Sequence, residues 1–141
     1  MTGLNNVPED LHAPPVVFIS HRKQDVALAE QLAEEIRQAG FQVWFDEWNI
    51  RIGDSIVERI NTGLENARYL ILCYSDAGVV SPWMSREWMS ALARQLDGYG
   101  VRVLPARLSG GGPPAILADI KYADLVQDWG RGVADLLQAM R

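Results

Sequence analysis

Near-continuous apolar runs occur at four places in the chain, and each has the length of a strand. β-Branched and aromatic residues dominate these runs, which is typical of strands buried on both faces of a sheet. A weaker run, KYADL at 121–125, is interpreted as a fifth strand. The four strong runs are VVFI at 16–19, FQVWF at 41–45, RYLILCY at 68–74 and VRVLP at 101–105.

Between these runs, apolar residues recur every three or four positions, which is the spacing of one helix face. The first such segment extends from Asp25 to Gly40, where the glycine is placed to end the helix. The second follows Asp54 and Ser55, either of which can cap it. Further helices are predicted over 82–96 and at the C-terminus. The apolar positions are Leu28, Ala29, Leu32, Ala33 and Ile36 in the first helix, Ile56, Ile60 and Leu64 in the second, and Val133, Leu136, Leu137 and Met140 in the last.

Three segments show neither pattern and are predicted to be irregular. Residues 1–14 contain proline and no periodicity, so we expect a flexible tail followed by one domain over 15–141. DEWNIRIGD at 46–54 is predicted to be a loop in which Gly53 permits unusual backbone angles. GGGPP at 110–114 is predicted to be another loop.

The alternation of strands and helices predicts an α/β fold. We expect a flavodoxin-like three-layer domain with a five-stranded parallel sheet, order 2-1-3-4-5, and helices on both faces. In such a sheet a ligand binds beyond the carboxyl ends of the strands, where the winding reverses between strands one and three. The loops that begin at Ser20, Asp46 and Ser75 all leave from this edge, which is therefore the predicted site.

Composition excludes several classes of function. The chain has 141 residues and a formal charge of -5, so a basic surface for nucleic acid is not expected. No apolar run is long enough to cross a membrane, and no secretory signal begins the chain. Cys73 is the only cysteine, which excludes an internal disulfide and favours a cytoplasmic location. It lies in a strand, so we expect a core residue rather than a nucleophile. Neither a metal-ligand motif nor a glycine-rich phosphate loop is present, and we expect no metal and no cofactor.

The stretch SPWMSREWMSAL at 81–92 places Trp83 and Glu87 four positions apart, on one face of the predicted helix. A tryptophan face can stack on a planar ring, and a carboxylate one turn away can bind sugar hydroxyls or stabilise a cationic sugar. This pairing would suit a nucleotide. Spacing alone favours the alternative that Trp83 and Trp88 pack in the core while Glu87 is a solvated helix charge.

Three segments in this order resemble a Toll/interleukin-1 receptor (TIR) domain, most closely the bacterial ones. They are VVFISHRKQD, then GFQVWFDEWNIRIGDSIVERINTGLENARYLILCYS, then SPWMSREWMSAL. The resemblance extends from about residue 15 to the end and is strongest between 16 and 92. It implies one of two functions, because some TIR domains only assemble with other TIR domains, whereas others cleave NAD⁺ between nicotinamide and ribose.

In the enzymatic members, a catalytic glutamate lies four residues after a tryptophan. Glu87 and Trp83 stand in these positions, so the resemblance implies an NAD⁺ nucleosidase in which NAD⁺ is the substrate. Nicotinamide is a good leaving group, so one carboxylate that stabilises the oxocarbenium-like ribose is sufficient. The products would be nicotinamide with ADP-ribose or with a cyclic isomer.

The resemblance also assigns roles around the pocket. It places Ser20, His21 and Arg22 along the nucleotide, with Arg22 as a donor to the pyrophosphate; a solvated turn is the alternative for this loop. Asp46 faces the ribose or holds its own loop by hydrogen bonds.

The loop at 46–54 is the surface through which family members self-assemble. Trp48 and Ile50 are its candidate anchors, although Trp48 can instead pack within the loop. Asn49 and Arg51 stand where other members often carry Lys or Glu, which leaves the charge contacts of this loop open.

The favoured hypothesis is therefore an NAD⁺ glycohydrolase or cyclase of bacterial, antiphage immune signalling, activated by self-assembly and coupled to a fused or separate sensor domain. A non-enzymatic interaction module is the main alternative. A nucleoside-processing glycosidase of related fold is a third hypothesis.

Overall fold

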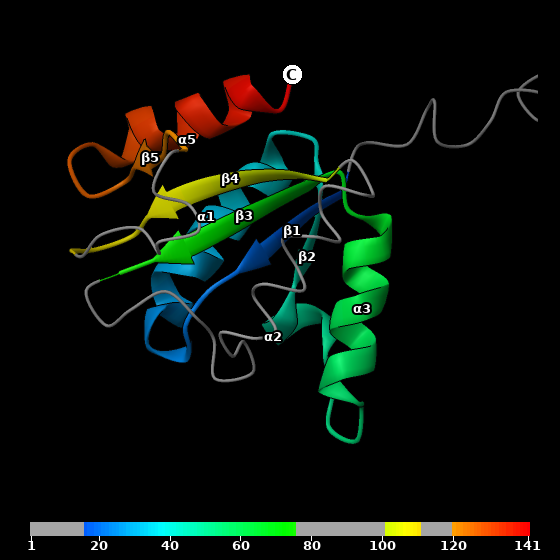
Figure 1. Ribbon diagram of the computed structural model, residues 1–141. Helices are drawn as coiled ribbons and strands as arrows, with labels where there is room; N and C mark the ends of the chain where they lie inside the picture. The colour runs from blue at the N-terminus through cyan, green and yellow to red at the C-terminus, as the bar shows by residue number, and fades with distance from the viewer. Residues whose placement is uncertain (1–15, 76–100, 111–119) are drawn as a thin grey trace, which may run out of the picture.

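The computed structural model describes residues 16–75, 101–110 and 120–141, which form a five-stranded parallel sheet with helices on both faces (Figure 1). The strand order β2-β1-β3-β4-β5 confirms the predicted fold class. The strands are β1 (Val16–Ser20), β2 (Gln42–Phe45), β3 (Tyr69–Tyr74), β4 (Arg102–Arg107) and β5 (Ala123–Asp124). The described helices are η3 (Lys23–Asp25), α1 (Val26–Gln38), α2 (Asp46–Asn49), α3 (Ile56–Asn66) and α5 (Trp129–Ala139).

One face of the sheet is covered by α1 and α5. Alternate strand residues, among them Val17, Ile19 and Ile71, join the apolar faces of these two helices in one buried cluster. A hydrogen bond ties the helices together, because the indole Nε1 of Trp129 donates to Glu35 Oε2 at 2.8 Å. Since these helices lie far apart in sequence, this layer closes only when the whole chain has folded.

Helix α3 covers the opposite face, where the intervening strand residues point. Phe18 and Trp44 are register partners on β1 and β2, and their rings stack with centroids 4.4 Å apart. Gly63 of α3 lies directly against them, so that a Cβ there would be 2.8 Å from the Trp44 ring and 2.9 Å from Phe18. The helix can therefore approach this aromatic pair only because it carries glycine at that position.

The ends of the helices follow the predicted signals. Gly40, at the end of α1, has a φ of 105°, and Gly53, in the loop before α3, has a φ of 95°. Of the two candidate caps for α3, Ser55 accepts a hydrogen bond through Oγ from the backbone N–H of Glu58, at 3.3 Å. Asp54 instead accepts the backbone N–H of Arg51, at 2.9 Å, which closes the turn before the helix.

Two sequence predictions need correction. The segment 46–54 is not a loop throughout, because one helical turn, α2, forms where Asn49 Oδ1 accepts the Phe45 N–H at 2.9 Å. The fifth strand has two residues rather than five, because Asp124 Oδ1 accepts the N–H groups of Val126 and Gln127 and turns the chain away. The predicted C-terminal helix is present as α5, and Asp128 caps its start by accepting the Arg131 N–H.

Other sequence predictions lie outside the described residues. They are the tail at 1–14, the helix over 82–96, and residues 111–114 of the predicted glycine-rich loop.

Candidate active site at the carboxyl edge of the sheet

His21 is the buried centre of the predicted edge. It follows β1 directly, is 3% exposed, and stacks on Phe45 of β2 with ring centroids 4.9 Å apart. Its Nε2 lies 2.8 Å from Asp46 Oδ1, and its Nδ1 lies 2.7 Å from the carbonyl oxygen of Arg22. Both ring nitrogens are thus engaged, so a direct hydrogen bond from His21 to a ligand would require one of these contacts to break.

Asp46 links this histidine to the segment after β2. Its side chain is 20% exposed, at the first residue of α2. The other end of the short helix is also held, because the Arg59 guanidinium donates to the Asn49 carbonyl oxygen from Nε at 3.0 Å and from Nη2 at 2.8 Å. The hydrogen bond between Asp46 and His21 joins the segment after β2 to the segment after β1.

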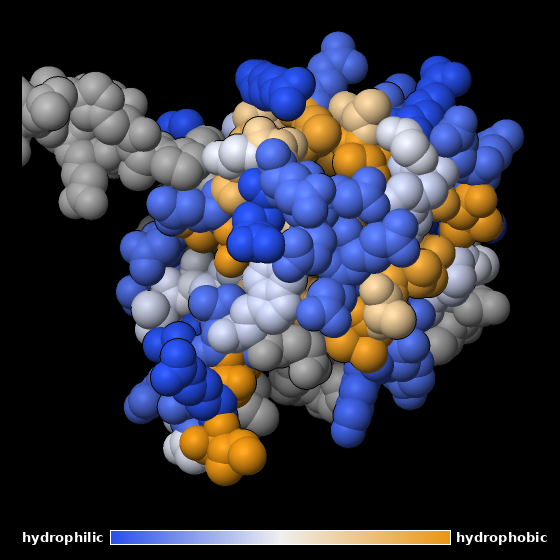
Figure 2. Space-filling model, turned by 180° about the vertical axis from the view of Figure 1, so that it is seen from behind, coloured by the Kyte–Doolittle hydropathy of each residue, from blue (hydrophilic) through white to orange (hydrophobic). Residues whose placement is uncertain are grey.

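Beyond these contacts, the segment projects from the body of the domain. Ile52 is fully exposed at its tip, with Arg51 and Gly53 beside it also exposed. Seen from behind, in Figure 2, the region below α3 ends in an apolar tip, whereas much of the surrounding surface is hydrophilic. A large aliphatic side chain in water at a loop tip is a candidate contact for another protein surface.

Trp48 packs inward instead. Its ring meets Phe45 edge-on with centroids 5.1 Å apart, and its Nε1 donates to Glu30 Oε2 of α1 at 3.1 Å. The Arg37 guanidinium lies 5.8 Å from the ring centroid, within the range of a cation–π contact. Of the two roles left open for Trp48, the structure therefore shows packing on α1.

Two buried serines lie at the same edge. Ser20 ends β1 and is 1% exposed, and Ser75 follows β3 and is 2% exposed. Arg22 is only partly buried, and its Nε approaches Gln24 Oε1 at 3.4 Å, which is a weak contact. The loop residues predicted from the sequence thus share one edge of the sheet, with His21 and the two serines inside and Arg22 at the surface.

Trp83 and Glu87 lie outside the described residues. Their chain segment begins after Ser75, which directly follows β3, and β3 is the neighbour of β1 in the sheet. The structure therefore describes the part of the predicted site that is formed by the loops after β1 and β2.

The carboxyl ends of β3 and β4 carry a second polar group. Tyr74 is fully buried, and burial, followed by the neighbouring Tyr122, raises its pKa to about 12 although Arg107 acts in the opposite direction. Arg107 Nη1 donates to Asp124 Oδ2 at 3.2 Å, and among the described residues its Nε and the Tyr74 hydroxyl have no hydrogen-bond partner.

Cys73, beside Tyr74, is completely buried, and burial, together with the charge of Asp25, raises its pKa strongly. A thiol that is rarely ionised is a poor nucleophile, so the sequence prediction of a core role is confirmed by its burial.

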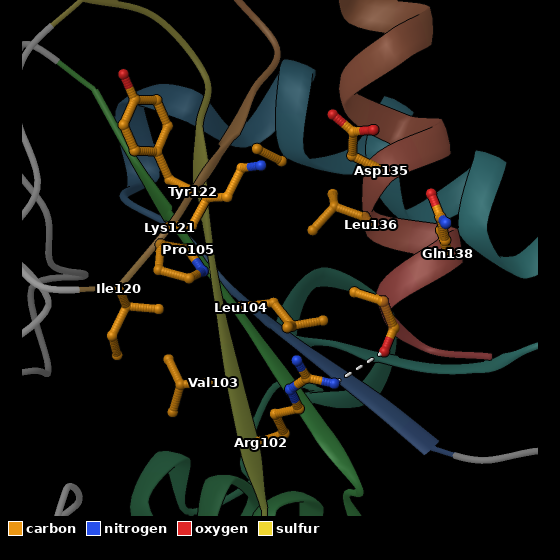
Figure 3. Close-up of a pocket in the computed structure, with 12 residues that line it drawn as sticks. Arg102, Val103, Leu104, Pro105, Ile120, Lys121, Tyr122, Asp135, Leu136 and Gln138 are labelled. Atoms are coloured by element: carbon orange, nitrogen blue, oxygen red, sulfur yellow. Dashed lines mark hydrogen bonds between the residues drawn. The ribbon is translucent and has the colours of Figure 1, made fainter.

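A pocket of about 410 Å³ lies away from this edge, between β4, the segment 120–123 and α5 (Figure 3). Leu104, Pro105 and Leu136 are among its apolar lining, and Lys121 and Asp135 are charged residues at it. Arg102 closes one side by donating from Nη1 to the Ala139 carbonyl oxygen at 3.2 Å. None of the predicted site residues lines this pocket, so it is not the predicted ligand site.

Two other kinds of site are absent from the part of the chain that the structure describes. Within 16–75, 101–110 and 120–141, no cluster of three or more His, Cys, Asp or Glu side chains is arranged to hold a metal ion. In the same ranges, no helix has the length and apolar character needed to span a bilayer.

Sequence reasoning missed the Arg59–Asn49 contact that anchors α2. Nothing in the spacing of Arg59 indicates that its side chain reaches a backbone carbonyl ten residues earlier. The exposed isoleucine at position 52 was also passed over in favour of Trp48 and Ile50. The sequence does indicate that this side chain is exposed, because Ile52 lies beside Gly53 in a polar stretch without helical or strand periodicity.

Curated relatives match the chain in part. It is 40% identical over 89 residues to the 2′ cyclic ADP-D-ribose synthase BtTIR of Bacteroides thetaiotaomicron, a match that covers 62% of this chain and 31% of that protein. It is 36% identical over 95 residues to the NAD(+) hydrolase PdTIR of Paracoccus denitrificans, a match that covers 66% of this chain and 31% of that protein. The chain thus spans about a third of the length of these relatives.

A solved structure shares the fold. The TIR domain of the Toll-related receptor TRR-2 of Hydra magnipapillata superimposes with a TM-score of 0.66 at 19% identity, covering 89% of this chain and 97% of that one. The family model described as TIR domain matches residues 17–137, which is most of the sequence. The chain therefore belongs to the TIR domain family.

Proposed function

We propose that this domain is an NAD⁺ nucleosidase that cleaves the bond between nicotinamide and ribose, with Glu87 as the catalytic carboxylate and Trp83 stacked on the substrate. The observation that carries the proposal is the similarity to relatives named as NAD(+) hydrolase and cyclic ADP-ribose synthase, in a chain with a glutamate four residues after a tryptophan. The protein would act in the cytoplasm, in bacterial antiphage signalling, with a fused or separate sensor domain as its trigger.

The chemistry needs few groups. Nicotinamide leaves as a neutral base from a pyridinium, so no general acid is required. Positive charge develops on the ribose as the bond breaks, and a carboxylate at Glu87 would stabilise it and bind the ring hydroxyls. Attack by water at the anomeric carbon gives ADP-ribose, whereas attack by an internal hydroxyl gives a cyclic isomer.

The described edge of the sheet supports a site for such a substrate. The partly exposed Arg22 supplies a guanidinium just beyond the carboxyl end of β1, beside the buried His21 and its partner Asp46. This is where parallel sheets bind nucleotides. Arg22 is the residue assigned to the pyrophosphate, because a guanidinium can donate two parallel hydrogen bonds to phosphate oxygens.

The test is the release of nicotinamide from NAD⁺ by purified protein at high concentration. Wild type is expected to release nicotinamide, and Glu87→Gln, which keeps the size of the side chain but removes its charge, is expected to lose at least about a hundredfold in rate. Chromatography of the second product distinguishes hydrolysis from cyclisation. Glu65→Gln is the control, since Glu65 is exposed on α3 away from the predicted edge, and it should retain full activity.

Self-assembly through the loop at 46–54 is the second part of the proposal. Ile52 at the tip of this loop is an apolar side chain fully exposed to water, and the pocket between β4 and α5 is a partly apolar hollow elsewhere on the same chain. We propose that the loop of one copy docks in this pocket of the next. Charges match, because Arg51 beside Ile52 would meet Asp135 of the pocket, and Asp54 would meet Lys121.

Because the two surfaces differ, such a contact repeats head to tail and extends without closing. Ile52→Asp is expected to abolish any concentration-dependent increase in sedimentation coefficient and in NAD⁺ cleavage, while Leu28→Asp on the exposed face of α1 leaves both unchanged. Either single reversal, Arg51→Glu or Asp135→Arg, is expected to weaken assembly. The double variant that carries both reversals should restore it. Failure of the double variant to restore assembly would refute this docking partner.

The competing function is a non-enzymatic module that only binds other TIR domains. It predicts assembly that depends on Ile52 but no nicotinamide from any preparation, including protein concentrated on a tethering surface. That result would exclude the enzymatic proposal and leave the assembly proposal standing.

A further inference from the structure

A row of three polar residues crosses the carboxyl ends of β3, β4 and β5. Tyr74, Arg107 and Asp124 are register partners on these strands, so their side chains leave the same face of the sheet. Cys73 and Ala106, one position earlier, belong to the buried cluster on the side of α1 and α5, so the row lies on the opposite face. Because ligands bind to parallel sheets beyond the carboxyl ends of the strands, the row stands at the edge where a ligand is expected.

Two hydrogen-bond donors of this row are buried and have no partner among the described residues. They are the hydroxyl of Tyr74, a residue that is 0% exposed, and Nε of Arg107. Burial raises the pKa of the Tyr74 hydroxyl to about 12, so at neutral pH this group keeps its proton and can donate it. Buried donors without an acceptor are costly and few in native proteins. Two of them on neighbouring strands indicate a place for an acceptor group from a ligand.

Asp124 fixes the orientation of the Arg107 guanidinium. Nη1 of Arg107 donates to Asp124 Oδ2 at 3.2 Å and to Oδ1 at 3.4 Å. Asp124 is itself held, because its Oδ1 accepts the N–H groups of Val126 and Gln127, each at 3.1 Å. With Nη1 directed at Asp124, the edge formed by Nε and Nη2 is left for another acceptor. A guanidinium edge of this kind donates two parallel hydrogen bonds to an anion.

Asp124 balances the charge of Arg107 only in part. The two distances exceed the value of about 2.7–2.9 Å that is usual for a hydrogen bond between charged groups. The carboxylate also accepts two backbone N–H groups, which stabilise its negative charge independently of Arg107. The Arg107 side chain is 28% exposed, so its outer part reaches solvent while Nε lies inside. The guanidinium therefore keeps positive charge for an anion that approaches from this edge.

We propose that Tyr74 and Arg107 form a subsite for the phosphate group of a ligand. Two phosphate oxygens accept from Nε and Nη2 of Arg107, and a third accepts from the Tyr74 hydroxyl. Tyr122, which is 41% exposed and meets the Tyr74 ring edge-on with centroids 6.1 Å apart, flanks the row. The subsite goes beyond the proposed function, because it lies on β3 and β4 rather than after β1, where Arg22 was assigned to the pyrophosphate.

The first experiment measures inorganic phosphate binding through thermal unfolding, with chloride at equal ionic strength as the reference. Wild type is expected to melt about 3–6 °C higher at a phosphate concentration of about ten times the dissociation constant. Tyr74→Phe removes one donor, and Arg107→Lys keeps the charge but removes the guanidinium edge. Each is expected to weaken phosphate binding about tenfold. Tyr74→Phe should fold normally, because the hydroxyl that it removes has no partner among the described residues.

The same chemical changes at the other end of β3 serve as controls. Tyr69→Phe lies at the first residue of that strand and Arg68→Lys directly before it. Both should show the wild-type phosphate shift relative to their own melting temperatures without phosphate. An equal shift in wild type, Tyr74→Phe and Arg107→Lys would overturn the proposal, and so would the absence of a shift in wild type.

The second experiment identifies the source of the phosphate group. The ¹⁵N–¹H resonance of Arg107 Nε, assigned by its loss in Arg107→Lys, is expected to move saturably as inorganic phosphate is added. A resonance that does not move overturns the proposal. If NAD⁺ displaces the phosphate, the subsite holds part of the proposed substrate, whereas phosphate that NAD⁺ does not displace assigns the subsite to a separate anion. Both of these results support the subsite, and neither requires that the protein cleave NAD⁺.

Discussion

Gly63 of α3 and Trp44 of β2 are in contact so close that no side chain fits between them. A Cβ on Gly63 would lie 2.8 Å from two atoms of the indole and 2.9 Å from the Phe18 ring stacked beneath it. These are ring atoms within a buried stack, so relief requires the helix or the stack to shift. The approach of α3 to the sheet, and hence the position at which the loop before it begins, depends on this glycine.

Gly63→Ala is accordingly expected to destabilise the domain by about 1–3 kcal/mol through overpacking, although alanine favours a helix by about 1 kcal/mol. Urea unfolding measures the change. Gly130→Ala on α5 is the matched control, since the nearest atom to its Cβ is 3.8 Å away, and it should be neutral or slightly stabilising. An unchanged midpoint for Gly63→Ala would show that α3 can shift without cost.

The contact between α1 and α5 through Trp129 and Glu35 predicts a second effect. Glu35→Ala removes the acceptor of a partly buried indole N–H and is expected to cost about 1–2 kcal/mol. Glu34→Ala breaks an exposed pair with Arg37 on the same helix and should change stability by less than about 0.5 kcal/mol. Thermal unfolding of the two variants side by side checks the difference. Equal melting temperatures would mean that the hydrogen bond from the Trp129 indole to Glu35 does not contribute to the stability of the contact between α1 and α5.

Arg59 is expected to restrain the loop that it anchors. Arg59→Met keeps the aliphatic stem but removes both hydrogen bonds to the Asn49 carbonyl oxygen, so amide exchange over residues 50–55 should accelerate about tenfold. Exchange in β3 should change much less. Arg68→Met, at an exposed side chain at the start of β3, serves as the control. If exchange over 50–55 is unaltered, the guanidinium does not hold the loop.

Cys73 is expected to be inert in the folded protein. Burial holds the thiol away from reagents and raises its pKa, so thiolate is scarce at pH 8. A disulfide reagent should therefore label less than one thiol per chain over minutes in buffer and one thiol per chain in denaturant. Rapid stoichiometric labelling of the native protein would contradict the burial of β3.

Tyr74 gives a prediction at alkaline pH. Its pKa is raised to about 12 in the folded protein, above the value of about 10 in an unfolded chain. The contribution to stability is then fully present below about pH 10 and is lost as the pH rises through the folded-state value.

Replacing the residue should remove this dependence. Tyr74→Phe is expected to be neutral or slightly stabilising at pH 7, because the buried hydroxyl has no partner among the described residues, and to lose less stability above pH 10 than wild type. Absorbance of tyrosinate, compared between the two proteins, reports the titration. A Tyr74 that ionises with the exposed tyrosines would contradict its burial.

The strand order and most strand bounds could be predicted because the buried strands read as unbroken apolar runs, such as YLILCY in β3. The end of β5 could not, because the turn at Asp124 depends on a side-chain oxygen that accepts two backbone N–H groups. Gly130 and Gly132 have low helix propensity, yet both lie within α5. At position 132 a larger residue would collide with Leu125, so close packing requires glycine there and outweighs its low helix propensity.

For the site, topology brought His21 and Asp46 to one edge, but no sequence pattern indicates that they contact each other across 25 residues. The role of Trp48 was undecidable from sequence because an exposed and a buried tryptophan look alike in a loop. Glu30, whose carboxylate receives the indole N–H, is one of several charges on the outer side of α1.

The brevity of β5 limits how this sheet can grow. It pairs with only Ala106 and Arg107 of β4, so the earlier part of that strand has no β5 partner. The N–H groups of Arg102 and Leu108 point toward β3. Because backbone N–H groups alternate in direction along a strand, those of the odd-numbered residues of β4 point away from β3. Pro105 is one of these, and it has no N–H to offer. An incoming strand could not form a continuous ladder of hydrogen bonds along this edge of the sheet, which disfavours edge-to-edge pairing with another copy of the domain.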